Sequence, residues 1–210
     1  MGVYIVVGGS SGIGMSLLEI LYKRKDTLYN FDIKKPNIET KNMADFIKVD
    51  LRKIDEVTKE VNRVFKKHDS IIDGVAIVAG VGYVTKLEDL NPQKFTEEVE
   101  LNLHIVYNFI YSCYSKMKEH TSIVTVSSIG SLGGTNVSLA YATAKAAIIG
   151  LTKQLAFELA PKKIRVNCVV PGPVNTSMAN DLTTSTERRL LKTLTPLSKL
   201  AEPYDIANSI

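Results

Sequence analysis

The sequence is poor in the residues from which metal centres and disulfide frameworks are built. Its 210 residues include two cysteines and three histidines. Cys113 and Cys168 lie in apolar stretches without a partner cysteine or a histidine at metal-ligand spacing, and His68, His104 and His120 are isolated. We therefore expect buried, reduced thiols in a reducing compartment and no metal site.

Long hydrophobic runs and dense charge of one sign are missing as well. No apolar run approaches the roughly 20 residues that span a bilayer. The apolar start leads into a glycine turn rather than into a signal-peptide pattern. The net charge is only +4, and the densest basic cluster, Lys34-Lys35, is too short for a nucleic-acid surface. We expect a cytoplasmic protein that binds neither nucleic acid nor a membrane.

What the sequence does contain is a regular alternation of short apolar and longer amphipathic segments. Hydrophobic residues make up 45% and charged residues 23% of the chain, as in an ordinary globular domain. The apolar segments predict strands buried on both faces, at residues 3–7, 27–31, 46–49, 71–78, 122–127 and 165–170. The amphipathic segments predict helices over 12–25, 53–67, 92–119 and 138–160. This alternation, without repeat or linker, predicts a single α/β domain over residues 1–210 with a doubly wound parallel sheet.

A glycine-rich turn joins the first predicted strand to the first predicted helix. It reads Gly8-Gly9-Ser10-Ser11-Gly12-Ile13-Gly14, and residues without side chains allow backbone to approach a pyrophosphate. The N-terminus of the following helix offers unpaired N–H groups and a partial positive charge to phosphates. Because the turn lies between a strand and a helix, it predicts a dinucleotide site; a purely structural turn is the alternative.

Asp32, at the end of the second predicted strand, bears on the choice of dinucleotide. A carboxylate there can accept hydrogen bonds from the adenosine ribose hydroxyls and would repel a 2′-phosphate. No basic residue occupies Ser11 or Ile33, although Lys34 and Lys35 follow closely. We predict a preference for NAD(H), with NADP(H) as the alternative; Asp32 as a solvated strand end is the simplest other interpretation.

Several motifs, in order along the chain, resemble those of the short-chain dehydrogenase/reductase family, which has a Rossmann fold. The glycine turn is similar to the family's Thr-Gly-x-x-x-Gly-x-Gly, with Val7 in place of the threonine. Tyr141-Ala142-Thr143-Ala144-Lys145 is similar to the family's Tyr-x-x-x-Lys, and Ser128 lies 13 residues before the tyrosine. Asn102 matches the family's helix asparagine, and Pro171-Gly172 matches its Pro-Gly after the sixth strand.

This resemblance implies an enzyme that moves a hydride between a nicotinamide cofactor and a carbonyl or alcohol carbon. Tyr141 and Lys145 are i and i+4 on one predicted helix, so they share a face. We expect Tyr141 to act as general acid/base, with the Lys145 ammonium and the oxidised nicotinamide lowering the pKa of its phenol. Lys145 would also bond the nicotinamide ribose. Ser128 would donate to the substrate oxygen as charge develops there, and Asn102 would hold a water that links Lys145 to solvent.

The same resemblance implies the set of cofactor contacts. They are Gly8, Ser10, Ser11, Gly12, Ile13, Gly14, Asp32, Asp50, Leu51, Ala79, Gly80, Tyr141, Lys145, Pro171, Gly172, Val174 and Thr176. Asp50 is assigned to the adenine amino group, and a cap at the end of a strand is an equal alternative for it.

The sequence departs from the family pattern in three respects. Val7 removes the hydroxyl that the family uses inside the glycine turn, so we expect a local effect on stability. Ile77 replaces an asparagine that bonds the central sheet, although Ala79-Gly80 still lets backbone pass close to a cofactor. The chain stops at Ile210, inside the helix that precedes the family's last strand, and we expect the fold to lack that strand.

The substrate and the biological role stay open. The segment at about 174–196 is expected to cover a small carbonyl or alcohol substrate as a lid, but its apolar and hydroxyl side chains name no compound. An NADPH-dependent 3-oxoacyl-type reductase is the alternative enzyme, and an NAD(H)-binding sensor with little catalysis is the alternative from another class. The resemblance also implies a homotetramer or homodimer, assembled through the predicted helices 92–119 and 138–160.

Overall fold

The computed structural model describes residues 1–36 and 42–210. Six parallel strands form one sheet in the order β3-β2-β1-β4-β5-β6. The strands are β1 (Val3–Val7), β2 (Thr27–Asp32), β3 (Asp45–Lys48), β4 (Gly74–Ile77), β5 (Ser122–Val126) and β6 (Arg165–Val169). All six predicted strands are therefore confirmed, and the sheet is doubly wound because the strand order reverses direction after β3, with β4 pairing on the far side of β1.

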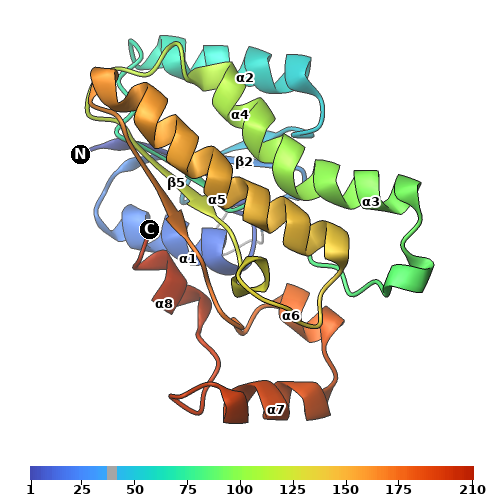
Figure 1. Ribbon diagram of the computed structural model, residues 1–210. Coiled ribbons are helices and arrows are strands. Elements are labelled where there is room, and N and C mark those ends of the chain that lie inside the picture. The colour runs from blue at the N-terminus through green and yellow to red at the C-terminus, as the bar shows by residue number, and fades with distance from the viewer. Residues whose placement is uncertain (37–41) are drawn as a thin grey trace.

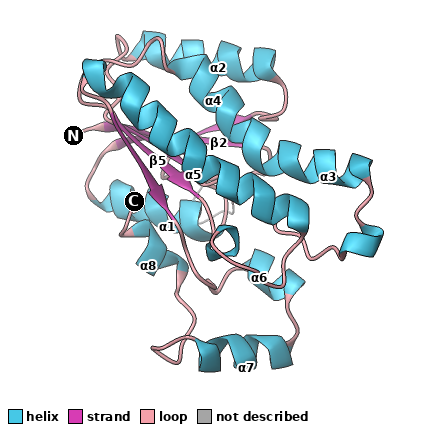
Figure 2. Cartoon of the chain, in the orientation of Figure 1, coloured by secondary structure: helices cyan, strands magenta, loops and turns pink. Residues whose placement is uncertain are grey.

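Helices cover both faces of the sheet (Figures 1 and 2). They are α1 (Gly12–Lys23), α2 (Ile54–Lys67), α3 (Pro92–Val99), α4 (Ile105–Cys113), α5 (Leu139–Leu159), α6 (Ser177–Leu182), α7 (Ser185–Leu194) and α8 (Pro203–Ala207). Short 3₁₀ turns are η1 (Leu87–Asp89), η3 (Ile129–Ser131) and η4 (Ala160–Lys162). The larger apolar core lies under α2, α4 and α5, and the smaller one under α1 and α8.

The helix predicted over 92–119 is wrong in two respects. A π-helical segment, η2 (Glu100–His104), separates α3 from α4. Inside it, the Asn102 side chain donates to the Glu98 carbonyl at 3.0 Å and so takes an acceptor that the α-helical ladder would otherwise use. The α-helix also ends at Cys113, because the Lys116 and Met117 N–H groups both bond the Cys113 carbonyl and tighten the chain into a turn.

The C-terminal part of the chain extends beyond the layered body. In Figure 1, α7 lies below the sheet and its helices, while α8 packs against α1. Within residues 1–36 and 42–210, no helix combines the length and the apolar character needed to cross a membrane. Because all six strands are parallel, the loops that follow β1, β2, β4 and β5 lie along one edge of the sheet.

Candidate active site

The glycine turn after β1 is built so tightly that side chains would not fit. Gly8 has φ +89° and Gly12 has φ +52°, conformations that side chains disfavour. A Cβ at Gly8 would lie 2.7 Å from the Ala79 backbone, and one at Gly14 would overlap the Gly8 carbonyl oxygen. The turn therefore passes directly beside the chain that follows β4 and leads into the N-terminus of α1, whose positive dipole end faces this edge.

Asn30 is part of this turn, although the sequence analysis did not single it out. Its side chain is 1% exposed, and its Oδ1 accepts from the Gly9 N–H at 3.0 Å while its Nδ2 donates to the Ser10 hydroxyl at 3.1 Å. Val7 brings no hydroxyl into the turn, and Asn30 supplies polar contacts there from the neighbouring strand. The signal in the sequence was an amide inside the otherwise apolar segment Leu28-Tyr29-Asn30-Phe31.

Asp32 closes β2 beside the same turn. Its Oδ2 accepts from the Ser10 N–H at 3.0 Å and its Oδ1 from the Lys34 N–H at 3.0 Å. The carboxylate is thus held at the place where the sequence predicts contact with a ribose. It is more than a solvated strand end, because two backbone N–H groups fix its position.

Ser128 and Tyr141 come together at the end of β5. Ser128 is the N-cap of η3, where its hydroxyl accepts from the Gly130 N–H at 3.2 Å. Tyr141 lies in the first turn of α5, which begins after its own N-cap, Ser138. A hydrogen bond with the Ser128 side chain lowers the pKa of the Tyr141 phenol, but burial outweighs it and the pKa is raised overall.

Lys145 is buried one helical turn further along α5. Its ammonium donates to the Val126 carbonyl at 3.1 Å, and the Ser127 hydroxyl donates to the Lys145 backbone carbonyl at 2.7 Å. Burial lowers the pKa of Lys145 to about 8, opposed by the nearby Cys168 thiol. The sequence analysis expected the ammonium to lower the pKa of Tyr141; in the protein alone, desolvation of the phenol acts in the opposite direction and prevails.

Asn102 and Gly80 complete the group around Lys145. Asn102 is fully buried, and its Oδ1 accepts from the Val81 N–H at 3.1 Å. A Cβ at Gly80 would lie 2.9 Å from Asn102 Oδ1 and 3.1 Å from Lys145 Nζ. The chain after β4 thus runs between Asn102 and Lys145, so the four side chains predicted to be catalytic lie along this one edge of the sheet.

The remaining predicted cofactor contacts lie on the loops of the same edge. Asp50 follows β3, and the Arg52 guanidinium bonds its carboxylate in a bidentate manner, with Nη2–Oδ2 2.6 Å and Nε–Oδ1 3.0 Å. This bond holds the pKa of Asp50 below its usual range. The Asp50 carboxylate also accepts from the Arg52 backbone N–H, so it caps the chain after β3, as the alternative interpretation expected. Arg52 is a partner that the sequence analysis missed.

The loop after β6 approaches the glycine turn. Thr176 is the N-cap of α6, and a Cβ at Gly12 would lie 3.3 Å from its methyl carbon. Pro171 accepts from the Ile129 N–H at 2.9 Å, and Val174 forms a bridge with Ala201. Leu51 is 8% exposed, whereas Gly172 lies on the surface.

Among the described residues, no three His, Cys, Asp or Glu side chains are grouped as a metal site would require.

Comparisons with known proteins agree on one family. The family model for short chain dehydrogenases matches residues 2–187. The chain is 30% identical over 214 residues to a 3-oxoacyl-acyl-carrier-protein reductase from Chlamydia muridarum, covering 97% of this chain and 86% of the relative. It is also 30% identical over 219 residues to a 3alpha-hydroxysteroid dehydrogenase from Mediterraneibacter gnavus, with coverages of 99% and 87%. A solved structure of a short chain dehydrogenase family protein from Francisella tularensis superposes with a TM-score of 0.89 at 29% identity, covering 100% of this chain and 89% of that one.

Proposed function

Because the chain belongs to the short-chain dehydrogenase family, we propose that it interconverts an alcohol and a carbonyl compound with NAD(H), using Tyr141 as the general acid/base. Membership of the family makes the chain an oxidoreductase that acts on CH–OH or carbonyl groups with a nicotinamide cofactor. The cofactor preference and the roles of individual residues are the content of the proposal.

One observation carries the proposal. The Ser128 side chain lies close enough to the Tyr141 phenol to lower its pKa, and the buried Lys145 ammonium lies 5.7 Å from the centre of the Tyr141 ring. A proton donor, a hydroxyl for the same substrate oxygen and a cation are thus grouped at the carboxyl end of β5, beside the glycine turn. This is the set of groups that proton transfer to a carbonyl oxygen requires.

The residues present fit a nicotinamide dinucleotide. The glycine turn and Gly80 form a surface that Cβ atoms would fill, and the N-terminus of α1 can face the pyrophosphate. Asp32 can accept from the ribose hydroxyls, whereas a 2′-phosphate would bring negative charge against its carboxylate. This argues for NAD(H) over NADP(H). The other cofactor contacts expected from the sequence are proposed in the same roles.

The roles of the catalytic side chains follow from their surroundings. A nicotinamide cofactor held by the glycine turn, Asp32 and Lys145 would supply the hydride chemistry. Tyr141, whose raised pKa keeps the phenol protonated at neutral pH, donates its proton to the substrate oxygen in the reducing direction. The Ser128 hydroxyl donates to the same oxygen as negative charge develops. Lys145 supplies positive charge near the phenol and a donor for the nicotinamide ribose, and Asn102 orders the chain and a water next to Lys145.

The segment 174–196 is proposed as the lid of this single domain. It carries α6 and α7, and the site for a Cβ at Gly82 is occupied by the Leu182 and Met178 side chains. The segment therefore touches the loop after β4, at the side where a substrate would reach Tyr141. A lid of this kind excludes water from the reacting carbon.

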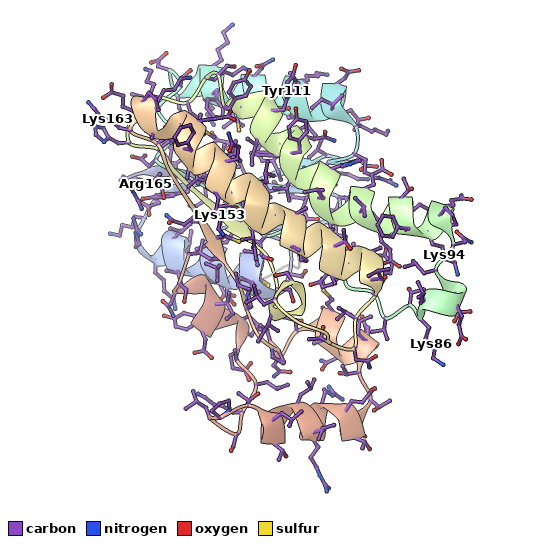
Figure 3. The ribbon with its side chains drawn as sticks, in the orientation of Figure 1. Lys86, Lys94, Tyr111, Lys153, Lys163 and Arg165 are labelled. Carbon is purple, nitrogen blue, oxygen red and sulfur yellow. The ribbon has the colours of Figure 1, made fainter. Side chains whose placement is uncertain are left out.

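A homo-oligomer is proposed through α4 and α5. Tyr107, Tyr111 and Tyr114 are each about half exposed, and their rings follow one another at centroid distances of 6.0 Å and 6.1 Å. Phe157 on α5 is 78% exposed. Figure 3 labels Tyr111 on α4 and Lys153 on α5, the two helices that carry this surface. Exposed aromatic side chains in such number are typical of a protein interface.

Two other functions compete with this one. A 3-oxoacyl-type reductase that uses NADPH is favoured by the name of the Chlamydia relative, and the Asp32 carboxylate argues against it. A cofactor-binding sensor with little catalysis is disfavoured by the grouping of Ser128 and Tyr141 beside Lys145. A protein that only binds the cofactor has no need of a proton donor and a hydroxyl placed for a substrate oxygen.

Parallel fluorescence titrations of the purified chain with NADH and NADPH test the proposal. Tighter binding of NADH, followed by turnover with members of a panel of ketones, sugars, steroids and acyl thioesters, supports it. Preference for NADPH would instead support the reductase, with Lys34 or Lys35 overriding Asp32. Binding of neither cofactor would contradict the proposal.

A further inference from the structure

Ser10, Asp32 and Lys34 close a ring of hydrogen bonds at the end of β2. The Ser10 N–H donates to Asp32 Oδ2 at 3.0 Å, and the Lys34 N–H donates to Asp32 Oδ1 at 3.0 Å. The Ser10 hydroxyl donates to the Lys34 carbonyl at 2.7 Å and so completes the ring. Two of these bonds join the glycine turn to Asp32 and Lys34, and the third holds the Asp32 carboxylate to the Lys34 backbone.

Asn30 anchors this ring to the core of the protein. Its amide bonds the Gly9 N–H with one atom and the Ser10 hydroxyl with the other. A Cβ at Gly9 would lie 2.7 Å from Asn30 Oδ1, so the turn and the amide are fitted closely together. The Ser10 hydroxyl thus accepts from the Asn30 amide and donates to the Lys34 carbonyl.

We infer that Asn30, acting through Ser10, is a positioning residue that determines the preference of the site for NAD(H) over NADP(H). The inference rests on the proposed function and deepens it, because it names the residues that hold Asp32. While the ring is intact, the carboxylate is fixed, and both backbone polar groups of Lys34 are bonded. A ribose with two free hydroxyls finds an acceptor there, whereas a 2′-phosphate meets a negative charge.

Breaking the ring should reduce the preference for NADH over NADPH. Without the Asn30 amide, the Ser10 hydroxyl is no longer oriented, and the segment that carries Lys34 gains freedom relative to Asp32. The Lys34 side chain is exposed, so its ammonium can then approach a 2′-phosphate and pair with it. NADH therefore loses affinity while NADPH loses less.

The experiment is a pair of titrations, with NADH and with NADPH, on the wild type and on Asn30→Ala. We expect NADH to bind about tenfold more weakly to the variant, and the ratio of the two dissociation constants to narrow at least about fivefold. Circular dichroism shows whether the variant folds. If it does not, Ser10→Ala takes its place, because it removes the hydroxyl that links Asn30 to the Lys34 carbonyl and leaves the Asn30 side chain in the core.

Lys34→Ala supplies the second half of the test. In the Asn30→Ala background, we expect it to weaken NADPH binding about fivefold or more, and in the wild-type background it should have a smaller effect. Thr152→Val is the matched control. It breaks a buried hydrogen bond of 2.7 Å between Thr152 and Thr125, far from the ring in the sequence and on other elements, so it should leave the ratio unchanged.

Equal weakening of NADH and NADPH by Asn30→Ala would overturn the inference, because a residue that only supports the fold affects both cofactors alike. The same conclusion follows if Lys34→Ala acts equally in both backgrounds. A wild type without preference for NADH would overturn the proposed cofactor preference and this inference together, and it is recognised before any variant is made.

Discussion

The Lys145 ammonium lies 5.7 Å from the centre of the Tyr141 ring, one helical turn away on α5. Burial acts on both groups in the direction of neutrality, because it raises the pKa of the phenol and lowers the pKa of the ammonium to about 8. The Tyr141 phenol therefore keeps its proton at neutral pH and can deliver it to a carbonyl oxygen. This relationship underlies the predictions that follow.

Gly80→Ala should slow catalysis while the fold persists. The added Cβ would lie 3.1 Å from Lys145 Nζ and 2.9 Å from Asn102 Oδ1, so these side chains must shift by a few tenths of an ångström. Since a displacement of about 1 Å in a catalytic group lowers the rate by about 10²-fold, we expect a smaller loss of about 3- to 10-fold, which steady-state kinetics would detect. Gly150→Ala on α5 is the control, because no atom lies within 4 Å of its added Cβ; normal turnover in Gly80→Ala would remove the argument.

Asn102→Ala should lower both stability and turnover. It leaves the Val81 N–H and the Glu98 carbonyl without their bonds to the side chain, which costs about 1–3 kcal/mol of unfolding free energy in chemical denaturation. Asn102→Asp keeps an acceptor for Val81 but places an oxygen against the Glu98 carbonyl, so it should be impaired as well. Full turnover in both variants would show that Asn102 has no part in the reaction.

Lys145→Met should reveal the buried charge through the pH dependence of stability. The folded pKa of about 8 is below the ordinary 10.5, so between these values the unfolded chain binds more protons and wild-type stability rises with pH. The unfolding free energy of the wild type minus that of the variant should increase by about 3 kcal/mol from pH 7 to pH 10.5. Tyr141 and Cys113 titrate in both proteins and cancel; a difference that does not change with pH would contradict the assignment.

Charge introduced among the exposed aromatic side chains of α4 and α5 should separate the subunits of the proposed oligomer. Light scattering of the wild type is expected to give the mass of a dimer or tetramer, and Tyr111→Glu combined with Phe157→Glu should give a monomer. Tyr22→Glu, at a tyrosine that is 49% exposed on α1, should leave the mass unchanged. A monomeric wild type would end the proposal of an oligomer.

The sequence predicted the layers of the fold better than their interruptions. Alternating apolar and amphipathic segments were sufficient for six strands and the helices between them, because the four central strands are largely buried. The edge strands β3 and β6 are more exposed than the expected burial on both faces. The π-helical segment at Asn102 could not be predicted, since it depends on a side chain that competes for the Glu98 carbonyl. A π-helical segment of this length also changes the spacing of apolar residues along the helix too little to be recognised in the sequence.

The candidate site shows the same division. Spacing placed Ser128, Tyr141 and Lys145 on neighbouring elements, and the structure brings them together. Asn30 and Arg52 were not predicted because each acts on a residue far along the chain or through a geometry that spacing does not describe. In the protein alone, the pKa of Tyr141 is raised, whereas the sequence analysis expected it to be lowered with the oxidised cofactor bound. Desolvation of the phenol is a property of the packed site and is not visible in the sequence.

The most direct test compares wild type and Tyr141→Phe in two assays, NADH binding by fluorescence and NADH-dependent reduction of a carbonyl panel. The account predicts turnover by the wild type, a loss of about 10²–10⁴-fold in the variant, and NADH binding that is retained. Equal turnover by the two proteins would contradict the role of Tyr141 as the general acid/base.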